Sequence, residues 1–158
     1  MNTNSITPEE RLAKLDIHLP EAPTPFGAYV PAVQSGNLLF LTGTLASVGH
    51  AVTITGILGK DLDVKGGRDA AFMAARNALA LMKQHLGSLN RVSRLVRIGV
   101  YAAATPEFRD HAKVADAASE LLRDVLGEQT VSSRLVIGVS SLPFGSPVEL
   151  EVIVEVKS

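Results

Sequence analysis

The chain has 158 residues, a formal net charge of −1 and no cysteine. This length is typical of a single domain that can bury a core, and the lack of cysteine excludes disulfides and thiolate-bound metals. No basic cluster larger than Arg91, Arg94 and Arg97 occurs, which argues against nucleic-acid partners because phosphate binding needs a basic surface. No apolar run approaches the roughly 18 residues of a membrane span, and the first residues lack the pattern of a signal peptide. A cytoplasmic protein without membrane partners is expected.

A short helix is expected near the start of the chain. Thr7 can cap it, Pro8 suits its first position and Glu10 completes a capping box. The proline-rich segment 20–25 disfavours helix and predicts an extended connector. We therefore interpret residues 1–21 as a helical appendage and residues 22–158 as the main domain.

Short strands are predicted to follow. Residues 29–33 favour a strand that Pro31 restricts to an edge or a strand start. Residues 38–42 are apolar and predict a buried strand. Residues 43–60 are rich in Gly, Thr and Val and predict a loop with one weak strand near residues 51–54.

Two long helices flank a further strand in the predicted order. Asp63 is expected to cap the first helix and Gly87 to end it. Spacings of three and four predict one apolar face made of Phe72, Ala75, Leu79, Met82 and Leu86. Residues 92–102 predict a strand. Thr105–Pro106 predict the start of the second helix, which runs to about Leu126 before Gly127.

The closing strands are predicted at residues 134–139 and 147–156, and the second alternates cleanly between apolar and charged positions. This order predicts an α+β domain, in which two helices cover only one face of the sheet. The strands at residues 95–102 and 134–139 are apolar on both faces, with Leu95, Val96, Ile98 and Val100 on alternating sides, so the uncovered face should expose apolar surface. Self-association would cover it. The alternative is that the N-terminal appendage lies there.

The sequence contains little sign of metal or cofactor chemistry. No pair of histidines has the spacing of metal ligands, and no glycine-rich phosphate loop follows a strand. The four histidines are therefore interpreted as structural or surface residues: His18, His50, His85 and His111. We expect no bound metal and no cofactor.

Arg134 is the most informative charged residue because it lies in an otherwise apolar strand. Buried arginine needs a partner, and its planar guanidinium suits a carboxylate. Glu149 on the last strand is the nearest internal candidate, and an ordinary ion pair remains the alternative to a functional role. Glu149 and Glu151 share one strand face. Outward charged side chains on an edge strand commonly protect it against aggregation, which is the alternative explanation for this pair.

Four segments together resemble the Rid family, also called YjgF-like, of reactive-intermediate imine deaminases. The resemblance covers roughly residues 22–156. It rests on the order and spacing of these segments: Pro25-Phe-Gly-Ala-Tyr29, Gly36-Asn-Leu-Leu-Phe-Leu-Thr-Gly43, Ser133-Arg134 through Leu142-Pro143, and Val148-Glu149-Leu-Glu151.

The resemblance implies a chorismate-mutase-like fold, a homotrimer with a central β-barrel, and clefts between subunits. It implies that Arg134 holds the carboxylate of a small imino or enamino acid such as 2-aminoacrylate. Water then adds to the C=N carbon and ammonia leaves, which gives a 2-keto acid without any cofactor. The partner implied is a small carboxylate substrate.

The same resemblance implies roles for further residues. Glu149 would orient the water or move its proton, and Tyr29 would line the cleft. Gly43 and Thr44 would border the pocket.

Two positions depart from the family pattern. Val136 stands where deaminating members often carry cysteine. Asp116 stands where asparagine is common, although a shift of one residue would place Ala115 there. Val136 and Asp116 are retained as substrate-binding candidates. These departures keep a second reading open, a non-catalytic trimeric module that binds small carboxylates. A third reading, endoribonuclease or translation inhibitor, is disfavoured by the acidic pI near 6.4.

Overall fold

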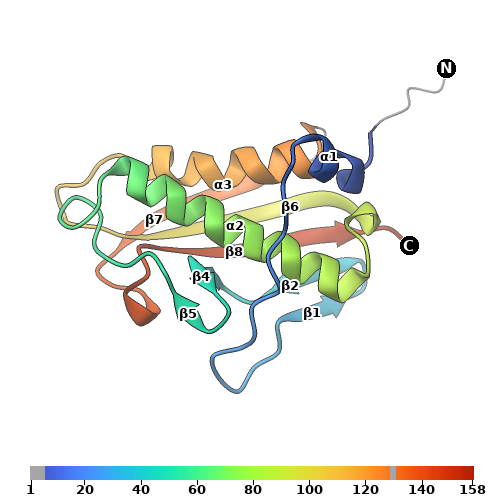
Figure 1. The fold of residues 1–158 in the computed structure, drawn as a ribbon, viewed down its shortest axis with the longest axis horizontal. Helices are drawn as coiled ribbons and strands as arrows, with labels where there is room; N and C mark the ends of the chain where they lie inside the picture. Colours follow the sequence, from blue (N-terminus) through green and yellow to red (C-terminus); the bar gives the residue numbers. More distant parts are fainter. Residues whose placement is uncertain (1–5, 129–130) are drawn as a thin grey trace.

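A computed structural model describes residues 6–128 and 131–158 of the chain. Within them, two long helices lie side by side on one face of a mixed sheet (Figure 1), which confirms the expected α+β class. The elements are α1 Pro8–Lys14, β1 Ala32–Ser35, β2 Leu38–Leu41, β3 Thr44–Leu45, β4 Ser47–Val48, β5 Ala51–Val52, α2 Val64–Leu86, η1 Leu89–Arg91, β6 Val92–Ala103, α3 His111–Leu126, β7 Ser133–Val139, η3 Pro143–Gly145 and β8 Val148–Val156.

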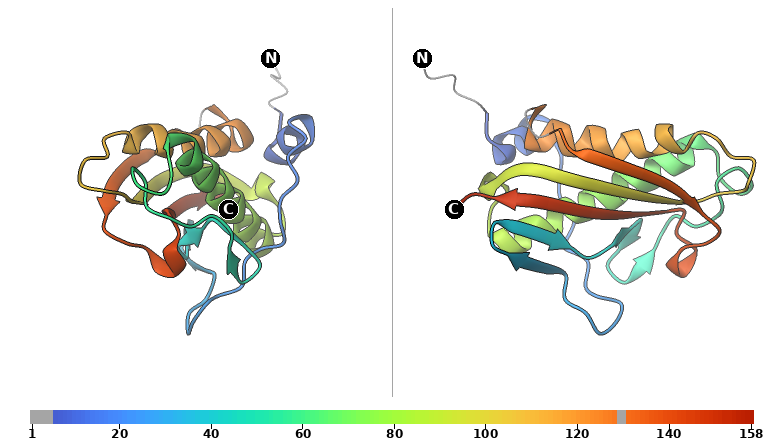
Figure 2. Two further views of the ribbon diagram at one scale, coloured as in Figure 1. Left: turned by 60° about the vertical axis from the view of Figure 1, so that its left-hand side comes forward. Right: turned by 180° about the vertical axis from the view of Figure 1, so that it is seen from behind.

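The main sheet has the strand order β1-β2-β8-β6-β7, and β3 also pairs with β8. Its pairings are antiparallel except that of β6 with β7. A parallel pair needs a long crossover, and α3 supplies it between β6 and β7. The crossover places the strand that carries Arg134 at one edge of the sheet, directly beneath α3 (Figure 2).

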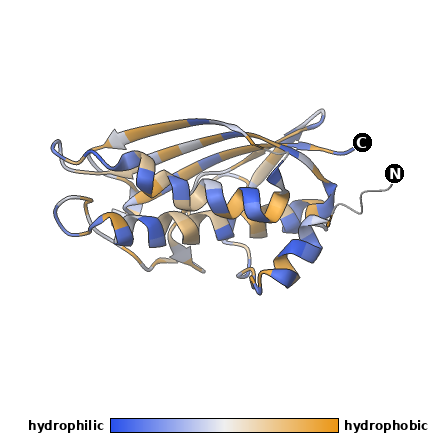
Figure 3. Ribbon diagram, turned by 90° about the horizontal axis from the view of Figure 1, so that it is seen from above, coloured by the Kyte–Doolittle hydropathy of each residue, from blue (hydrophilic) through white to orange (hydrophobic). Residues whose placement is uncertain are grey.

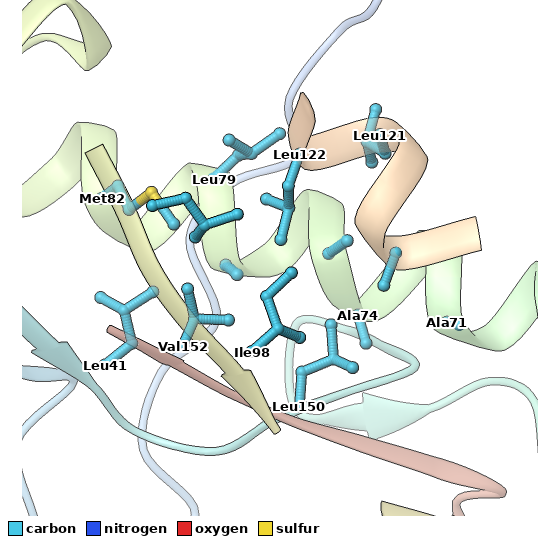
Figure 4. Packing of buried hydrophobic residues seen from close by; sticks show 14 of the residues in the cluster. Leu41, Ala71, Ala74, Leu79, Met82, Ile98, Leu121, Leu122, Leu150 and Val152 are labelled. Atoms are coloured by element: carbon cyan, nitrogen blue, oxygen red, sulfur yellow. The ribbon is translucent and has the colours of Figure 1, made fainter. Parts of the chain in front are cut away.

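The core lies between the helices and the sheet. Strand β8 alternates strictly, with its valines and Leu150 buried and the residues between them only partly buried. Helix α2 contributes many fully buried alanines, and such small side chains let it pack closely on α3 and β8. Figure 4 shows Leu79, Leu122 and Ile98 meeting in this layer, and Figure 3 shows the mixed hydropathy of the helices above it.

The N-terminal helix begins as predicted. Thr7 and Glu10 form the capping box around Pro8. Glu9 fastens the helix to the domain: its carboxylate accepts hydrogen bonds from Lys83 Nζ (2.8 Å) and from the backbone N–H of Leu89 (2.9 Å). Helix α1 therefore packs on α3 and η1, on the helical side of the molecule (Figure 2). The alternative that this appendage covers the open sheet face is wrong for the residues that the structure describes.

Both predicted early strands need correction. The first begins at Ala32 rather than at Tyr29, because the chain enters the ladder only after Pro31, which lacks an N–H. In β2 only Leu39 and Leu41 are buried, so the strand is buried on one face and not on both. The loop at 43–60 contains three short strands instead of one weak strand.

Helix α2 has its predicted caps, but the predicted apolar face of α2 and the predicted start of α3 need correction. Asp63 accepts from the N–H of Gly66, and Gly87 ends α2 in the left-handed conformation (φ 80°). Phe72 is exposed, so it does not belong to the buried face. Helix α3 begins at His111, because the Phe108 N–H donates to the Thr105 carbonyl (3.1 Å) and closes a turn there.

Strand β6 is also less regular than its sequence suggests. A register shift lies between Leu95 and Arg97. As a result Leu95 and Ile98 are both buried, although they are three residues apart and would face opposite sides of a regular strand. The expected alternation of apolar residues along 95–100 is therefore wrong at this bulge.

Apolar side chains nevertheless remain exposed on strands of the sheet. Leu135 and Ile137 on β7 are each 39% exposed, and Phe40 on β2 is 40% exposed. None of the described helices covers the face of the sheet seen from behind in Figure 2. Among the described helices, none is both long and apolar enough to span a bilayer.

Candidate functional site

Arg134 lies on β7 opposite the buried Ile98, and its side chain points to the helical side of the sheet. Its Nη1 donates to Asp116 Oδ1 (2.7 Å) and to Ser119 Oγ (3.1 Å), both on α3. The residue as a whole is exposed because its backbone lies at the sheet edge, but its side chain is only 27% exposed. Its internal partner is therefore Asp116, and the expectation that Glu149 would be the nearest partner is wrong.

A cavity of about 360 Å³ lies beside this arginine. It is lined by Leu95, Ile98, Asp116, Ser119, Glu120, Arg123, Val131, Ser132 and Arg134. Within the described chain all hydrogen bonds of the guanidinium come from Nη1, so its Nη2 and Nε have no protein partner there. A planar guanidinium with an unused edge can still bind a second carboxylate through two parallel hydrogen bonds.

Glu149 lies on the opposite face of the sheet, on β8 next to β3. It packs so closely on Gly43 that a β-carbon at position 43 would overlap its Oε1 and lie 3.1 Å from its Cδ. Burial raises the pKa of the Glu149 carboxyl above its ordinary value, because a desolvated carboxylate is less stable than its neutral form. A carboxyl with a raised pKa is a better candidate for proton transfer than an exposed glutamate, because its protonated form persists to higher pH.

Tyr29 and Thr44 line a narrow hollow together with Gly43. The Tyr29 hydroxyl accepts a hydrogen bond from the N–H of Phe26 (3.0 Å). Thr44 is 2% exposed, and its hydroxyl has no hydrogen-bond partner among the described residues. Because an unpaired buried hydroxyl is costly, Thr44 is a natural contact for a bound water or ligand.

These residues form two separate groups in one chain. Arg134 and Asp116 lie at the β7 edge on the helical side, whereas Glu149 and Gly43 lie near β3 on the other face. Arg134 on β7 and Glu149 on β8 are two strands apart, about 10 Å at a spacing of about 4.8 Å. Ile98, the partner of Arg134 on β6, pairs with Val152, so Glu149 also lies three residues, about 10 Å, further along β8. A small ligand cannot contact both groups within one protomer.

Val136 belongs to neither group. It pairs with Val100 on β6 and packs against the core, and it is not among the residues that line the cavity. Ser119 and Arg123 also line the cavity, and they are not among the site residues predicted from the sequence. Their spacing from Asp116 on α3, three and seven residues, places them on the same helical face, so the helical periodicity alone could have grouped them.

No cluster of three or more metal-ligating side chains occurs within residues 6–128 and 131–158.

Two further polar contacts had no clear signal in the sequence. Asn77 is buried on α2, and its Nδ2 donates to the carbonyls of Leu45 (3.0 Å) and Ser47 (2.9 Å). Tyr101 on β6 donates to Glu151 Oε2 (3.0 Å), and this hydrogen bond raises the pKa of the tyrosine.

Comparison with known proteins places this geometry in context. A family model described as "YjgF/chorismate_mutase-like, putative endoribonuclease" matches residues 9–156. Protein TCP17 of Trypanosoma cruzi is 37% identical over 148 residues, which are 93% of this chain and 92% of that protein. The solved structure of Atu1372 from Agrobacterium tumefaciens, a protein of unknown function, superimposes with a TM-score of 0.87 at 38% identity and covers 95% of this chain and 92% of its own. A 2-iminobutanoate/2-iminopropanoate deaminase of Dermatophagoides farinae is 28% identical over 142 residues, 89% of this chain and 95% of that protein.

Proposed function

Because the chain belongs to the YjgF/Rid family, with its chorismate-mutase-like fold, we propose that it hydrolyses small 2-imino or enamino acids to 2-keto acids and ammonia. The name of the Dermatophagoides farinae relative, an iminobutanoate deaminase, supports this reaction. The observation that carries the proposal is the Arg134 side chain, which lies beside a cavity of about 360 Å³ with one edge of its guanidinium unused.

Arg134 would hold the substrate carboxylate through two parallel hydrogen bonds from Nη2 and Nε. This charge-assisted pair fixes the position of the adjacent imine carbon, and orientation of that kind supplies a large share of the catalysis. Water attacks the C=N carbon and forms a C–O bond, while a proton moves to the nitrogen. Ammonia then leaves with the former C–N electrons, the oxygen loses its proton, and the 2-keto acid remains.

Glu149 would move the protons in this sequence. Its carboxylate accepts a proton from the attacking water, and its carboxylic acid returns it to the departing nitrogen. Because burial raises the pKa of Glu149, both forms are accessible closer to neutral pH than for an exposed glutamate. The unpaired Thr44 hydroxyl would hold the same water, and the Tyr29 hydroxyl would contact the substrate.

This chemistry requires a second copy of the chain, because Arg134 and Glu149 lie on opposite faces of the sheet in one protomer. We propose a homotrimer in which the open sheet faces form a central β-barrel. The exposed Leu135 and Ile137 would be buried there. Each cleft would combine Arg134 and Asp116 of one subunit with Tyr29, Gly43, Thr44 and Glu149 of its neighbour. Val136 would support the strand of Arg134 instead of contacting substrate.

The test is a coupled assay. A pyridoxal-phosphate enzyme generates 2-aminoacrylate, and lactate dehydrogenase reports the pyruvate formed with and without the purified protein. Arg134→Ala should lower kcat/KM by about 100-fold or more, since loss of one partner of a sheltered charge pair costs on the order of 2–5 kcal/mol. Arg134→Lys is the matched control, because it keeps the charge and removes the planar fork; it should retain part of the activity.

Four results would overturn the proposal. The first is a wild-type rate equal to the uncatalysed rate, and the second is an Arg134→Ala variant with wild-type kcat/KM. The third is a monomer in analytical ultracentrifugation at the assay concentration. Arg134-dependent binding of small carboxylates without turnover would also overturn it and would indicate a binding module.

A further inference from the structure

We infer that Asp116 makes the Arg134 cavity selective for molecules in which a carboxylate lies next to a positively charged nitrogen, over simple carboxylates of the same size. This inference rests on the proposed function, because it takes the cavity as the substrate site. It names the charged form that the site binds, an iminium or ammonium acid. It also assigns Asp116 a specificity role.

The first argument is the position of Asp116 on the guanidinium. Its Oδ1 already occupies Nη1 at 2.7 Å, so an incoming carboxylate must use Nη2 and Nε on the same small group. The two carboxylates would then lie side by side in a partly desolvated cavity, where like charges repel strongly. A simple carboxylate meets this repulsion without compensation.

A positively charged nitrogen next to the ligand carboxylate reverses this balance. Asp116 and Arg134 form a fixed pair of opposite charges at the cavity wall. A ligand with its own opposite charges on neighbouring atoms can align antiparallel to that pair, with the carboxylate on Arg134 and the nitrogen beside Asp116. Each charge of the ligand then faces its opposite.

The remaining charges of the cavity do not supply this selectivity. Glu120 pairs with Arg68 (2.9 Å), and Arg123 pairs with Asp124 (2.8 Å). The described part of the lining therefore holds two acidic and two basic side chains, whose charges sum to zero. Ser119 accepts a hydrogen bond from Nη1 (3.1 Å), which leaves its own hydroxyl hydrogen available to a ligand oxygen.

The selectivity has a consequence for the reaction. The protonated imine is the more electrophilic form of the substrate, and it is the form whose nitrogen Asp116 would attract. The 2-keto acid product has lost that nitrogen and is a simple carboxylate. It should therefore bind more weakly than the substrate, which favours product release.

The test compares two small ligands of nearly equal size, alanine and lactate. Alanine carries an ammonium group at the position where lactate carries a hydroxyl. Isothermal titration calorimetry on the full chain gives the Kd of each. Wild type should bind alanine at least about tenfold more tightly than lactate, and Asp116→Asn should reduce this preference by about tenfold, where tenfold equals about 1.4 kcal/mol. Arg134→Ala should lose both ligands.

Asp69→Asn is the matched control. It removes the same charge from an exposed aspartate on the neighbouring helix α2, where Asp69 pairs with Lys65. Neither residue lines the cavity, so this variant should keep the wild-type preference. Thermal unfolding confirms that each variant is folded. An unchanged preference in a folded Asp116→Asn protein that still deaminates imino acids would overturn this inference alone. A folded wild type that binds neither ligand would overturn the cavity as the substrate site, and the inference with it.

Discussion

Replacement of Gly43 by alanine separates the position of Glu149 from the stability of the fold. A β-carbon at position 43 would overlap Glu149 Oε1 and lie 3.1 Å from Cδ and 3.4 Å from Cγ. The carboxyl group must therefore move by about 1 Å, and a misplacement of that size near the reacting atoms costs about 100-fold in rate. We expect kcat/KM for imine hydrolysis to fall by about this factor.

The stability of the Gly43→Ala protein should change little. The overlapping atoms belong to the end of a flexible side chain, and Gly43 is not among the glycines with positive φ. Replacing a glycine by alanine lowers the conformational entropy of the unfolded chain and so raises the unfolding free energy by about 0.4–1 kcal/mol. This gain offsets the cost of moving Glu149. Chemical denaturation should therefore place the unfolding free energy within about 1 kcal/mol of wild type.

Gly67→Ala is the contrasting control. Its β-carbon would lie 2.7 Å from side-chain atoms of both Leu58 and Val114 in the core, and overpacking of this kind costs about 1–3 kcal/mol. This variant should lose stability while the folded fraction keeps its activity. Wild-type kcat/KM in a folded Gly43→Ala protein would refute the reasoning, because it would mean that the position of the Glu149 carboxyl is irrelevant to the reaction.

Two further predictions concern single side chains. Because burial raises the pKa of Glu149 above 4.5, kcat/KM should rise with pH through that raised pKa as the catalytic carboxylate forms, and Glu149→Gln should abolish this limb of the pH–rate profile. Because the pKa of Glu149 is raised in the folded state, the folded protein binds this proton more tightly than the unfolded chain does. The unfolding free energy of wild type should therefore fall as pH rises from about 4.5 through the raised pKa. Urea denaturation of Glu149→Gln should show no such fall. Asn77→Ala should lower the unfolding free energy by about 1–3 kcal/mol in urea, since it removes the two buried hydrogen bonds that Asn77 donates to the Leu45 and Ser47 carbonyls. The exposed Gln84→Ala on the same helix should stay within about 0.5 kcal/mol of wild type, and equal stability of the two variants would contradict the role given to Asn77.

The sequence determined the features that depend on neighbours within one or two turns of chain. The capping box at Thr7, the cap at Asp63 and the left-handed end at Gly87 follow from local hydrogen bonds and backbone sterics. The alternation of β8 follows from the two-residue period of a strand. The order and spacing of four segments between Pro25 and Glu151 also indicated the family, because such a pattern can be read along the chain without knowing how it folds.

Only the tertiary structure decided which distant residues meet. Arg134 faces Asp116 because the parallel pairing of β6 and β7 requires a crossover, and α3 is that crossover. Glu149 reaches Gly43 because β3 pairs with β8. It points away from the helices, and so away from Arg134, because it alternates with the buried Val148 and Leu150. Strand order and the bulge in β6 are set by the joint packing of the whole sheet, so no local pattern in the sequence specifies them.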